Sequence, residues 1–326
     1  MPMLARTVSA IALTALMTAP AVAQEVWVSN ERDNTISIID VPSLEVIETI
    51  QVGARPRGLM FSHDYKVAYL CASDDSTIQV IDTATREILH NLPSGENPET
   101  FALHPDNRHI YISNEDDNIT SVLDVVDRRI VAQIPVGVEP EGKAINHAGT
   151  IAITTSETTN MAHWIDTTTH EIFHNSLVGS RPRHAEFTSD DKRLVVSAEI
   201  GGGLHVFDTE TFEELAEIRF EIPDVHAHDI QPVGFRLTDD MTRAYVALGP
   251  ANRVAVVDMQ NYEVLEYHLV GRRVWHMAMS DDETKLFTTN GVSGDVTVID
   301  LVRGEPVKTI KVGRFPWGAA YRPAGS

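Results

Sequence analysis

Short runs of alternating apolar and polar residues follow one another along almost the whole chain, and each run ends at a polar turn. One run extends from Val46 to Val52, a turn with Gly and Pro follows at residues 53–56, and a polar hairpin lies at residues 63–66. Alternation with a period of two is typical of β-strands that are buried on one face. Apolar spacing typical of helices is not found at useful length after residue 23. The pattern therefore predicts an all-β protein.

The strand pattern recurs, and each copy contains an apolar residue followed by Asp. Neighbouring copies lie 42 residues apart, except for 50 residues between Asp208 and Asp258. Each unit contains four strand-like runs separated by turn residues, which is typical of a β-propeller blade. We therefore expect a seven-bladed β-propeller of four-stranded blades, with the aspartates as turn residues that accept backbone N–H groups. The repeated aspartates are Asp40, Asp82, Asp124, Asp166, Asp208, Asp258 and Asp300.

The two ends of the pattern predict how the ring closes. Val26-Trp27-Val28 matches the second strand of a repeat, whereas residues 315–321 match the first strand. We expect the C-terminal segment to supply the inner strand of a blade whose other three strands come from residues 26–51. Such a shared blade joins the ring and leaves no open sheet edge.

Residues 1–23 have the features of a secretory signal peptide. Arg6 provides a short basic region, Val8 to Met17 is almost wholly apolar or small, and Ala21-Val22-Ala23 fits the cleavage rule. We predict cleavage after Ala23, a periplasmic location, and a single propeller domain over residues 24–326. No later stretch of about 20 apolar residues is found, so no membrane span is expected in the mature chain.

Charge and cysteine usage exclude several classes of function. Without residues 1–23 the chain has 25 basic and 47 acidic residues, a formal charge of −22. So acidic a surface repels phosphate backbones, which disfavours nucleic acid as the main ligand. Cys71 is the only cysteine, which excludes an internal disulfide, a thiolate zinc cluster and a haem attachment motif. It falls in a strand-like run and is predicted to be a small buried side chain.

Two motifs resemble a known repeat family. The motif Val-x-Asn/Ser with Ile/Val-Asp downstream, and the turn Val-Gly-x-x-Pro-x-Gly at residues 52–58 and 136–142, resemble YVTN-type β-propeller repeats. Residues 101–106, 155–163 and 247–258 are similar to the periplasmic propellers associated with PQQ-dependent alcohol catabolism, and the likeness covers the whole mature chain. Proteins of that family are typically encoded near quinoprotein dehydrogenases and a transporter, so the resemblance implies an accessory role in the same system. It does not imply a quinoprotein, because the tryptophan docking motif of those larger propellers is not found.

Equivalent positions around the predicted ring suggest a ligand site at the mouth of the channel. One arc of the loops that enter the inner strands is rich in Arg and Trp. Guanidinium groups pair with carboxylates and indoles stack on flat rings, so a small anionic ligand such as PQQ or an organic acid would suit this arc. The alternative is that Arg57, Arg183 and the glutamates form salt bridges between adjacent blades. The candidate ligand-binding residues are Arg55, Arg57, Arg181, Arg183, Arg273, Trp275 and Trp317.

Histidines near the one irregular spacing suggest a metal site. The eight-residue excess is placed at residues 223–230, and irregular insertions in a repeat array tend to mark the binding face. In the adjoining repeats, His184 and His276 stand at the position that is Gly or Thr in every other complete repeat. Imidazoles with a carboxylate bind zinc or copper. The alternative is surface histidines with ordinary titration. The candidate ligands are His184, His226, His228 and His276, with Glu199 or Glu157 within reach.

Three functions follow from these features. The first is a non-catalytic periplasmic binding protein that serves an alcohol-oxidising quinoprotein system, with a dehydrogenase or transporter component as partner. The second is a metal-dependent hydrolase, such as a lactonase, that uses the histidines. The third, single-stranded nucleic acid binding, is disfavoured by the net charge. A binding protein is favoured over an enzyme, because the sequence has no Gly-x-Ser-x-Gly elbow, phosphate loop or His-Glu-x-x-His motif.

Overall fold

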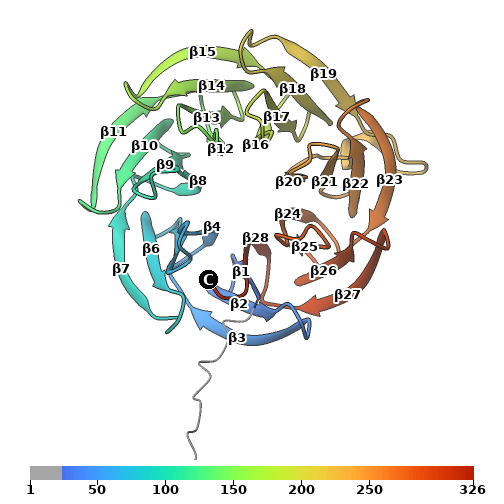
Figure 1. Ribbon diagram of the computed structural model, residues 1–326, viewed down its shortest axis with the longest axis horizontal. Helices are drawn as coiled ribbons and strands as arrows, with labels where there is room; N and C mark the ends of the chain where they lie inside the picture. Colours follow the sequence, from blue (N-terminus) through green and yellow to red (C-terminus); the bar gives the residue numbers. More distant parts are fainter. Residues whose placement is uncertain (1–23) are drawn as a thin grey trace, which may run out of the picture.

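The chain forms a ring of seven blades around a central axis (Figure 1). The computed structural model describes residues 24–326, and within this range 28 strands make seven four-stranded sheets whose neighbouring strands are antiparallel. The predicted fold class and blade number are confirmed. The predicted signal peptide lies outside the described residues. No helix within residues 24–326 has the length and apolar character needed to cross a membrane.

The blades are numbered along the chain, and each is given from its innermost to its outermost strand. Blade 1 contains β28 (Pro316–Arg322), β1 (Glu25–Asn30), β2 (Thr35–Asp40) and β3 (Glu45–Gln51). Blade 2 contains β4 (Pro56–Phe61), β5 (Val67–Ala72), β6 (Thr77–Asp82) and β7 (Ile88–Pro93). Blade 3 contains β8 (Pro98–Leu103), β9 (His109–Asn114), β10 (Ile119–Asp124) and β11 (Arg129–Pro135). Blade 4 contains β12 (Pro140–Ile145), β13 (Ile151–Ser156), β14 (Met161–Asp166) and β15 (Glu171–Leu177).

The other three blades follow the same plan. Blade 5 contains β16 (Pro182–Phe187), β17 (Arg193–Ala198), β18 (Gly203–Asp208) and β19 (Glu214–Arg219). Blade 6 contains β20 (Phe235–Leu237), β21 (Arg243–Ala247), β22 (Arg253–Asp258) and β23 (Glu263–Leu269), and the short helix η1 (Ala227–Asp229) precedes it. Blade 7 contains β24 (Val274–Met279), β25 (Lys285–Asn290), β26 (Asp295–Asp300) and β27 (Glu305–Lys311).

The ring closes through the shared blade that the sequence predicts. β28 pairs antiparallel with β1, and Val26 lies opposite Tyr321 in this ladder. Figure 1 shows β28 and β1 side by side in blade 1. The pairing gives the inner edge of β1 a hydrogen-bonded partner, which it would otherwise lack.

Hydroxyl groups join neighbouring blades. In several blades a buried Ser or Thr of the second strand donates a hydrogen bond to a backbone carbonyl at the start of the next blade's innermost strand, or just before it. Cys71 takes the equivalent place in blade 2 and is fully buried, as predicted. Each such bond satisfies a carbonyl that is hidden from solvent and fixes two blades relative to one another. The donors and their acceptors are Ser29 with Arg57 (2.8 Å), Ser113 with Glu141 (2.7 Å), Ser197 with Val233 (2.6 Å) and Thr289 with Trp317 (2.6 Å).

The repeated aspartates are turn residues, as predicted. Asp166 is representative, because its Oδ1 accepts the backbone N–H groups of Thr168 and Thr169, both at 2.8 Å. These hydrogen bonds lower the pKa of the Asp166 carboxyl. The carboxylate thereby orders the turn before the outermost strand, and it belongs to the scaffold.

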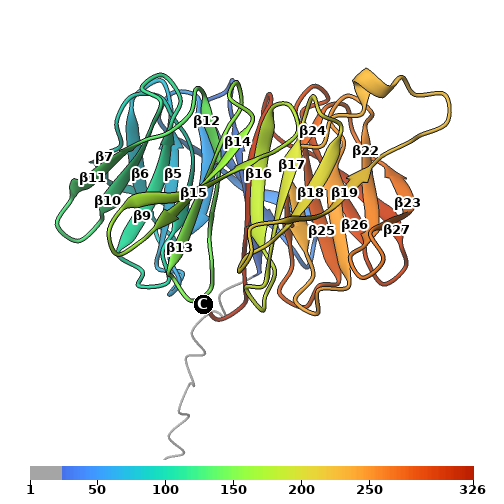
Figure 2. The ribbon, with the colours of Figure 1, turned by 90° about the horizontal axis from the view of Figure 1, so that it is seen from above.

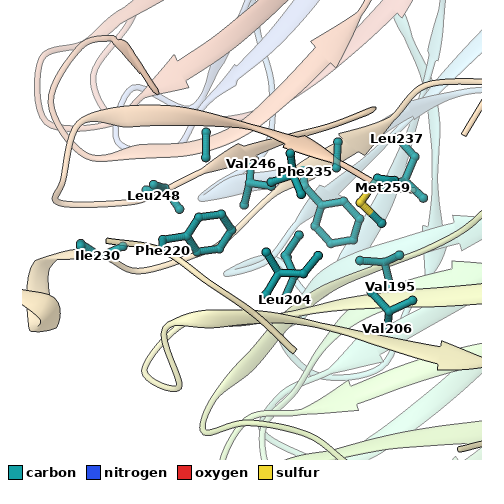
Figure 3. Packing of buried hydrophobic residues seen from close by; sticks show 14 of the residues in the cluster. Val195, Leu204, Val206, Phe220, Ile230, Phe235, Leu237, Val246, Leu248 and Met259 are labelled. Carbon is teal, nitrogen blue, oxygen red and sulfur yellow. The ribbon is translucent and has the colours of Figure 1, made fainter. Parts of the chain in front are cut away.

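Apolar clusters fill the spaces between blades. The cluster between blades 5 and 6 includes Phe235 of β20 together with Phe220 and Ile230 (Figure 3). Phe220 and Ile230 lie at the two ends of the irregular segment between β19 and β20. The segment between them projects beyond the ring of blades (Figures 1 and 2). The insertion is therefore held by its ends, and its tip is directed to solvent.

Thr289→Val tests the bonds between blades. The substitution keeps the shape of the side chain but leaves the buried carbonyl of Trp317 without its donor, which should cost roughly 1–3 kcal/mol of unfolding free energy. Urea unfolding of the wild type and the variant measures this loss. The control is Thr309→Val on the exposed face of β27, which should change little. Equal stability of the two variants would contradict the role assigned to the hydroxyl.

Candidate functional site

One end of the channel carries a layer of charged and aromatic side chains, here called the mouth layer. The mouth face comprises the loops that enter the innermost strands and the loops that join the second and third strands. The side chains come from these loops and from the first residues of the innermost strands. The layer consists of Glu31, Arg55, Arg57, Asp74, Glu99, Glu115, Glu141, Glu157, Arg181, Arg183, Glu199, Arg273, Trp275 and Trp317.

Arg183 is the buried centre of one half of the mouth layer. Its Nη2 lies 3.2 Å from Glu141 Oε1, and its Nη1 donates to Glu157 Oε1. Its Nε lies 3.7 Å from Glu199 Oε2. Glu141 and Glu157 belong to blade 4, whereas Arg183 and Glu199 belong to blade 5, so this cluster joins the two blades.

Two further arginines extend this half of the layer. Arg181 Nε lies 2.8 Å from Glu157 Oε2 and 3.1 Å from Glu199 Oε2. Arg273 Nη2 donates to Glu199 Oε1 at 2.9 Å, and its guanidinium carbon lies 4.2 Å from the centre of the Trp275 ring. A cation over an indole face adds attraction to that of the ion pair.

The other half of the layer is built around Glu99 of blade 3. Arg57 Nη1 donates to Glu99 Oε2 at 2.5 Å, and Arg55 Nη2 donates to Oε1 at 2.8 Å. The guanidinium of Arg57 also lies 5.2 Å from the Trp317 ring. Both arginines come from blade 2, so this cluster again joins neighbouring blades.

The structure thus brings the predicted arginines to one face and pairs each with carboxylates. Salt bridges between adjacent blades, the alternative for Arg57 and Arg183, are confirmed. Binding of a small anion at these residues stays a prediction. An anion would have to compete with carboxylates that already occupy the guanidinium groups.

Carboxylates outnumber guanidinium groups in the mouth layer, and this imbalance shifts pKa values. Burial, followed by the negative charge of Glu99, raises the pKa of Glu115 to about 7. Burial also raises the pKa of Glu141 and of Glu157. Glu99 differs, because Arg57 and Arg55 outweigh the effect of burial and lower its pKa. Part of the excess negative charge is therefore held as protonated carboxyl groups near neutral pH.

The predicted metal ligands form two separate pairs. The rings of His184 and His276 lie in the wall of the channel with centroids 5.8 Å apart. The rings of His226 and His228 stack at 5.3 Å on the exposed tip of the insertion. In residues 24–326 no three His, Cys, Asp or Glu side chains are arranged to hold a metal ion. The predicted site is not assembled, because the insertion turns outward and the arginines engage Glu199 and Glu157.

Comparison with known proteins places this ring in a family. A family described as YNCE-like beta-propeller matches residues 2–322. The chain belongs to this family. No curated protein matches its sequence.

Solved structures share the fold of this YNCE-like propeller at low sequence identity. Hydrazine synthase from Kuenenia stuttgartiensis is 16% identical with a TM-score of 0.78, and the match covers 89% of this chain and 99% of that one. A protein of unknown function from Desulfotomaculum acetoxidans is 17% identical with a TM-score of 0.79, covering 92% and 99%. A protein proposed to be a 6-phosphogluconolactonase from Bacteroides uniformis is 15% identical with a TM-score of 0.76, covering 92% and 99%. These similarities show the fold alone.

The YNCE-like propeller also has two charged channel residues that the sequence analysis did not select. Arg236 of β20 and Glu186 of β16 line a cavity of about 300 Å³ within the channel. Arg236 Nη1 lies 3.3 Å from Glu186 Oε2 and 3.3 Å from His184 Nε2. Alignment of the repeats distinguishes Arg236 and Glu186, because the equivalent residues of the other blades are small or apolar. Those residues are Met60, Ala102, Ala144, Ala278 and Ala320.

Glu115→Gln tests the charge imbalance of the mouth layer. The folded protein keeps the Glu115 proton up to a pKa of about 7, whereas the unfolded chain loses it near the ordinary value of 4.5. Stability of the wild type should therefore fall as pH rises through this window. The variant should show a smaller fall, measured as melting temperature between pH 5 and pH 8. Asp117→Asn, an exposed change in the same loop, is the control, and an unchanged pH profile in Glu115→Gln would refute the expectation.

Arg183→Met tests whether the buried cation supports the ring. The substitution leaves Glu141, Glu157 and Glu199 without their central partner, which should lower the unfolding free energy by about 3–5 kcal/mol. Arg181→Met is the matched control, because that side chain is nearly half exposed and its loss should cost less. Urea unfolding compares the two. Equal losses would show that burial of Arg183 adds nothing to its role.

Proposed function

We propose that this YNCE-like propeller is a periplasmic accessory protein that binds a protein partner through its mouth face. The observation that carries the proposal is a set of aliphatic side chains at the tips of the mouth-face loops. Ile200 is 58% exposed and Val292 is 48% exposed, and Val138 is also exposed on this face. Apolar side chains within a polar rim are a common arrangement at protein–protein contacts, and we take these three side chains as the contact points of the partner.

The mouth layer supports a partner better than it supports a small anion. Its guanidinium groups already hold glutamates, so PQQ or an organic acid would have to displace groups of its own charge. A protein partner can instead cover the paired charges and contact the exposed loops. The ion pairs between blades also hold these loops in place before a partner arrives, which reduces the entropy cost of binding.

The proposed location and the proposed class of partner come from the sequence. The features of residues 1–23 support export to the periplasm, and residues 101–106, 155–163 and 247–258 resemble propellers associated with PQQ-dependent alcohol catabolism. We therefore propose a quinoprotein dehydrogenase or a transporter component as the partner. A metal-dependent hydrolase has less support, because the candidate histidines lie in two separate pairs.

The double variant Ile200→Asp, Val292→Asp tests the mouth face. Charges at these loop tips should weaken copurification of a dehydrogenase or transporter component at least about tenfold, because desolvating a carboxylate in an apolar contact is costly. Quantitative mass spectrometry of the proteins bound to the tagged propeller, from cells grown on an alcohol, measures the change.

The control double variant carries Asp at Val126 and Val302. These side chains are 65% and 78% exposed, and they lie in the loops before the outermost strands, at the other end of the ring. The control should copurify the partner as the wild type does. Equal loss in both double variants, or absence of both partner classes from the wild-type sample, would overturn the proposal.

A further inference from the structure

Beyond the mouth layer, the channel contains the cavity of about 300 Å³ that Arg236 lines. Its wall is formed by the innermost strands, and its lining reaches His147 in the hairpin after β12. That hairpin lies at the end of the ring opposite the mouth face, and the His147 side chain is exposed. The cavity is therefore a separate feature from the surface considered under Proposed function.

Two of the innermost strands that line this cavity depart from the repeat, and the departure places larger side chains in the cavity wall. Most innermost strands have Gly at one position, where they approach the next blade closely. A Cβ on Gly142, for example, would lie 2.8 Å from the carbonyl oxygen of Arg183. His184 and His276 occupy the equivalent position in blades 5 and 7. Gly234 provides the space for one ring, because a Cβ there would lie 2.6 Å from His276 Nδ1.

Arg236 presents one edge of its guanidinium to this space. Every hydrogen bond that its side chain makes to residues 24–326 uses Nη1. Its partner Glu186 is committed, since Oε1 accepts the backbone N–H of Leu237 at 3.0 Å and Oε2 faces Nη1. The Arg236 side chain is 35% exposed and lines the cavity. The edge formed by Nε and Nη2 is therefore available for a planar two-oxygen group.

The surroundings favour a guest that is polar at one end and apolar at the other. Burial lowers the pKa of His184 and of His276, so both imidazoles are neutral at pH 7 and add no charge to that of Arg236. Trp317 Nε1 and His276 Nε2, in the same wall, are buried polar atoms without a hydrogen-bond partner among the described residues. Phe101 and Phe187 supply apolar wall elsewhere in the cavity.

We propose that this cavity binds a small carboxylic acid with a short apolar body. The carboxylate lies on the Nε and Nη2 edge of Arg236, and the apolar body packs against Phe101 and Phe187. The acid enters from the face opposite the mouth layer. The match of a guanidinium edge to two coplanar oxygens favours a carboxylate over an alcohol or an amide, because neither of those offers two coplanar oxygens that share a negative charge.

Isothermal titration calorimetry with benzoate and hexanoate as probes tests this site, with benzamide as an uncharged compound of the same shape. The wild type should bind at least one of the two acids and should bind benzamide more weakly. Arg236→Gln should weaken acid binding at least about tenfold, because it removes a charged two-point contact. Arg243→Gln is the matched control, since this arginine is similarly exposed, faces Asp258 and does not line the cavity. It should bind as the wild type does.

Two results overturn the proposal: neither acid binds to the folded wild type at millimolar concentration, or Arg236→Gln binds as tightly as the wild type. If Arg236→Gln does not fold, Arg236→Lys replaces it, because an ammonium group keeps the charge but lacks the planar edge that donates to two oxygens, and this change should also weaken binding. Acid binding should persist in the Ile200→Asp, Val292→Asp variant. The cavity and the mouth face can therefore fail independently of one another.

Discussion

Each blade of this propeller depends on its neighbours, because a four-stranded sheet has two faces and can bury neither alone. The apolar clusters and the hydroxyl-to-carbonyl bonds between blades satisfy this requirement only if the ring is complete. Pairing of β28 with β1 completes it. One result is that residues one repeat apart in the chain become neighbours around the axis. Arg57 and Glu99, 42 residues apart, form an ion pair for this reason.

The channel shows what happens when the repeat changes at equivalent positions. At the mouth, large charged residues replace one another from blade to blade, and their burial requires that each charge be paired or that carboxyl groups keep protons. Further along the channel, the small residues that let strands approach are replaced by His184 and His276, and a cavity forms beside them. Both features arise from the same scaffold. The charged groups of the mouth layer are paired with one another, whereas the cavity beside His184 and His276 is open.

The sequence predicted the architecture because the repeat is nearly perfect. The blade number, the shared blade, the turn role of Asp166 and its equivalents, and the burial of Cys71 all follow from one 42-residue period. The period also placed Arg57 and Arg183 correctly on one face. The salt bridges between adjacent blades, the stated alternative, follow from the same period, because Glu99 and Glu141 occupy the positions equivalent to Arg57 and Arg183 in the neighbouring blades.

The predicted metal site is not assembled in the structure. Two of its residues lie in the insertion, which is the one segment that departs from the 42-residue period. The direction of the insertion depends on the burial of Phe220 and Ile230 at its ends, and periodicity holds no information on that packing. Arg236 was overlooked for a related reason, since it follows the insertion and stands out only when blade 6 is aligned with the other blades past this irregularity. Predictions were most reliable where residues repeat and least reliable where they depend on one irregular loop.

The shared blade also bears on how the chain reaches its folded state. β1 is among the first strands along the sequence, yet its inner neighbour, β28, is the last. Blade 1 therefore cannot form by local contacts, and its assembly must wait for two distant segments to meet. Long-range pairing of this kind slows folding and leaves a strand edge exposed to wrong partners in the meantime. Completion of the ring is thus also the step at which the chain ceases to be vulnerable to misassembly.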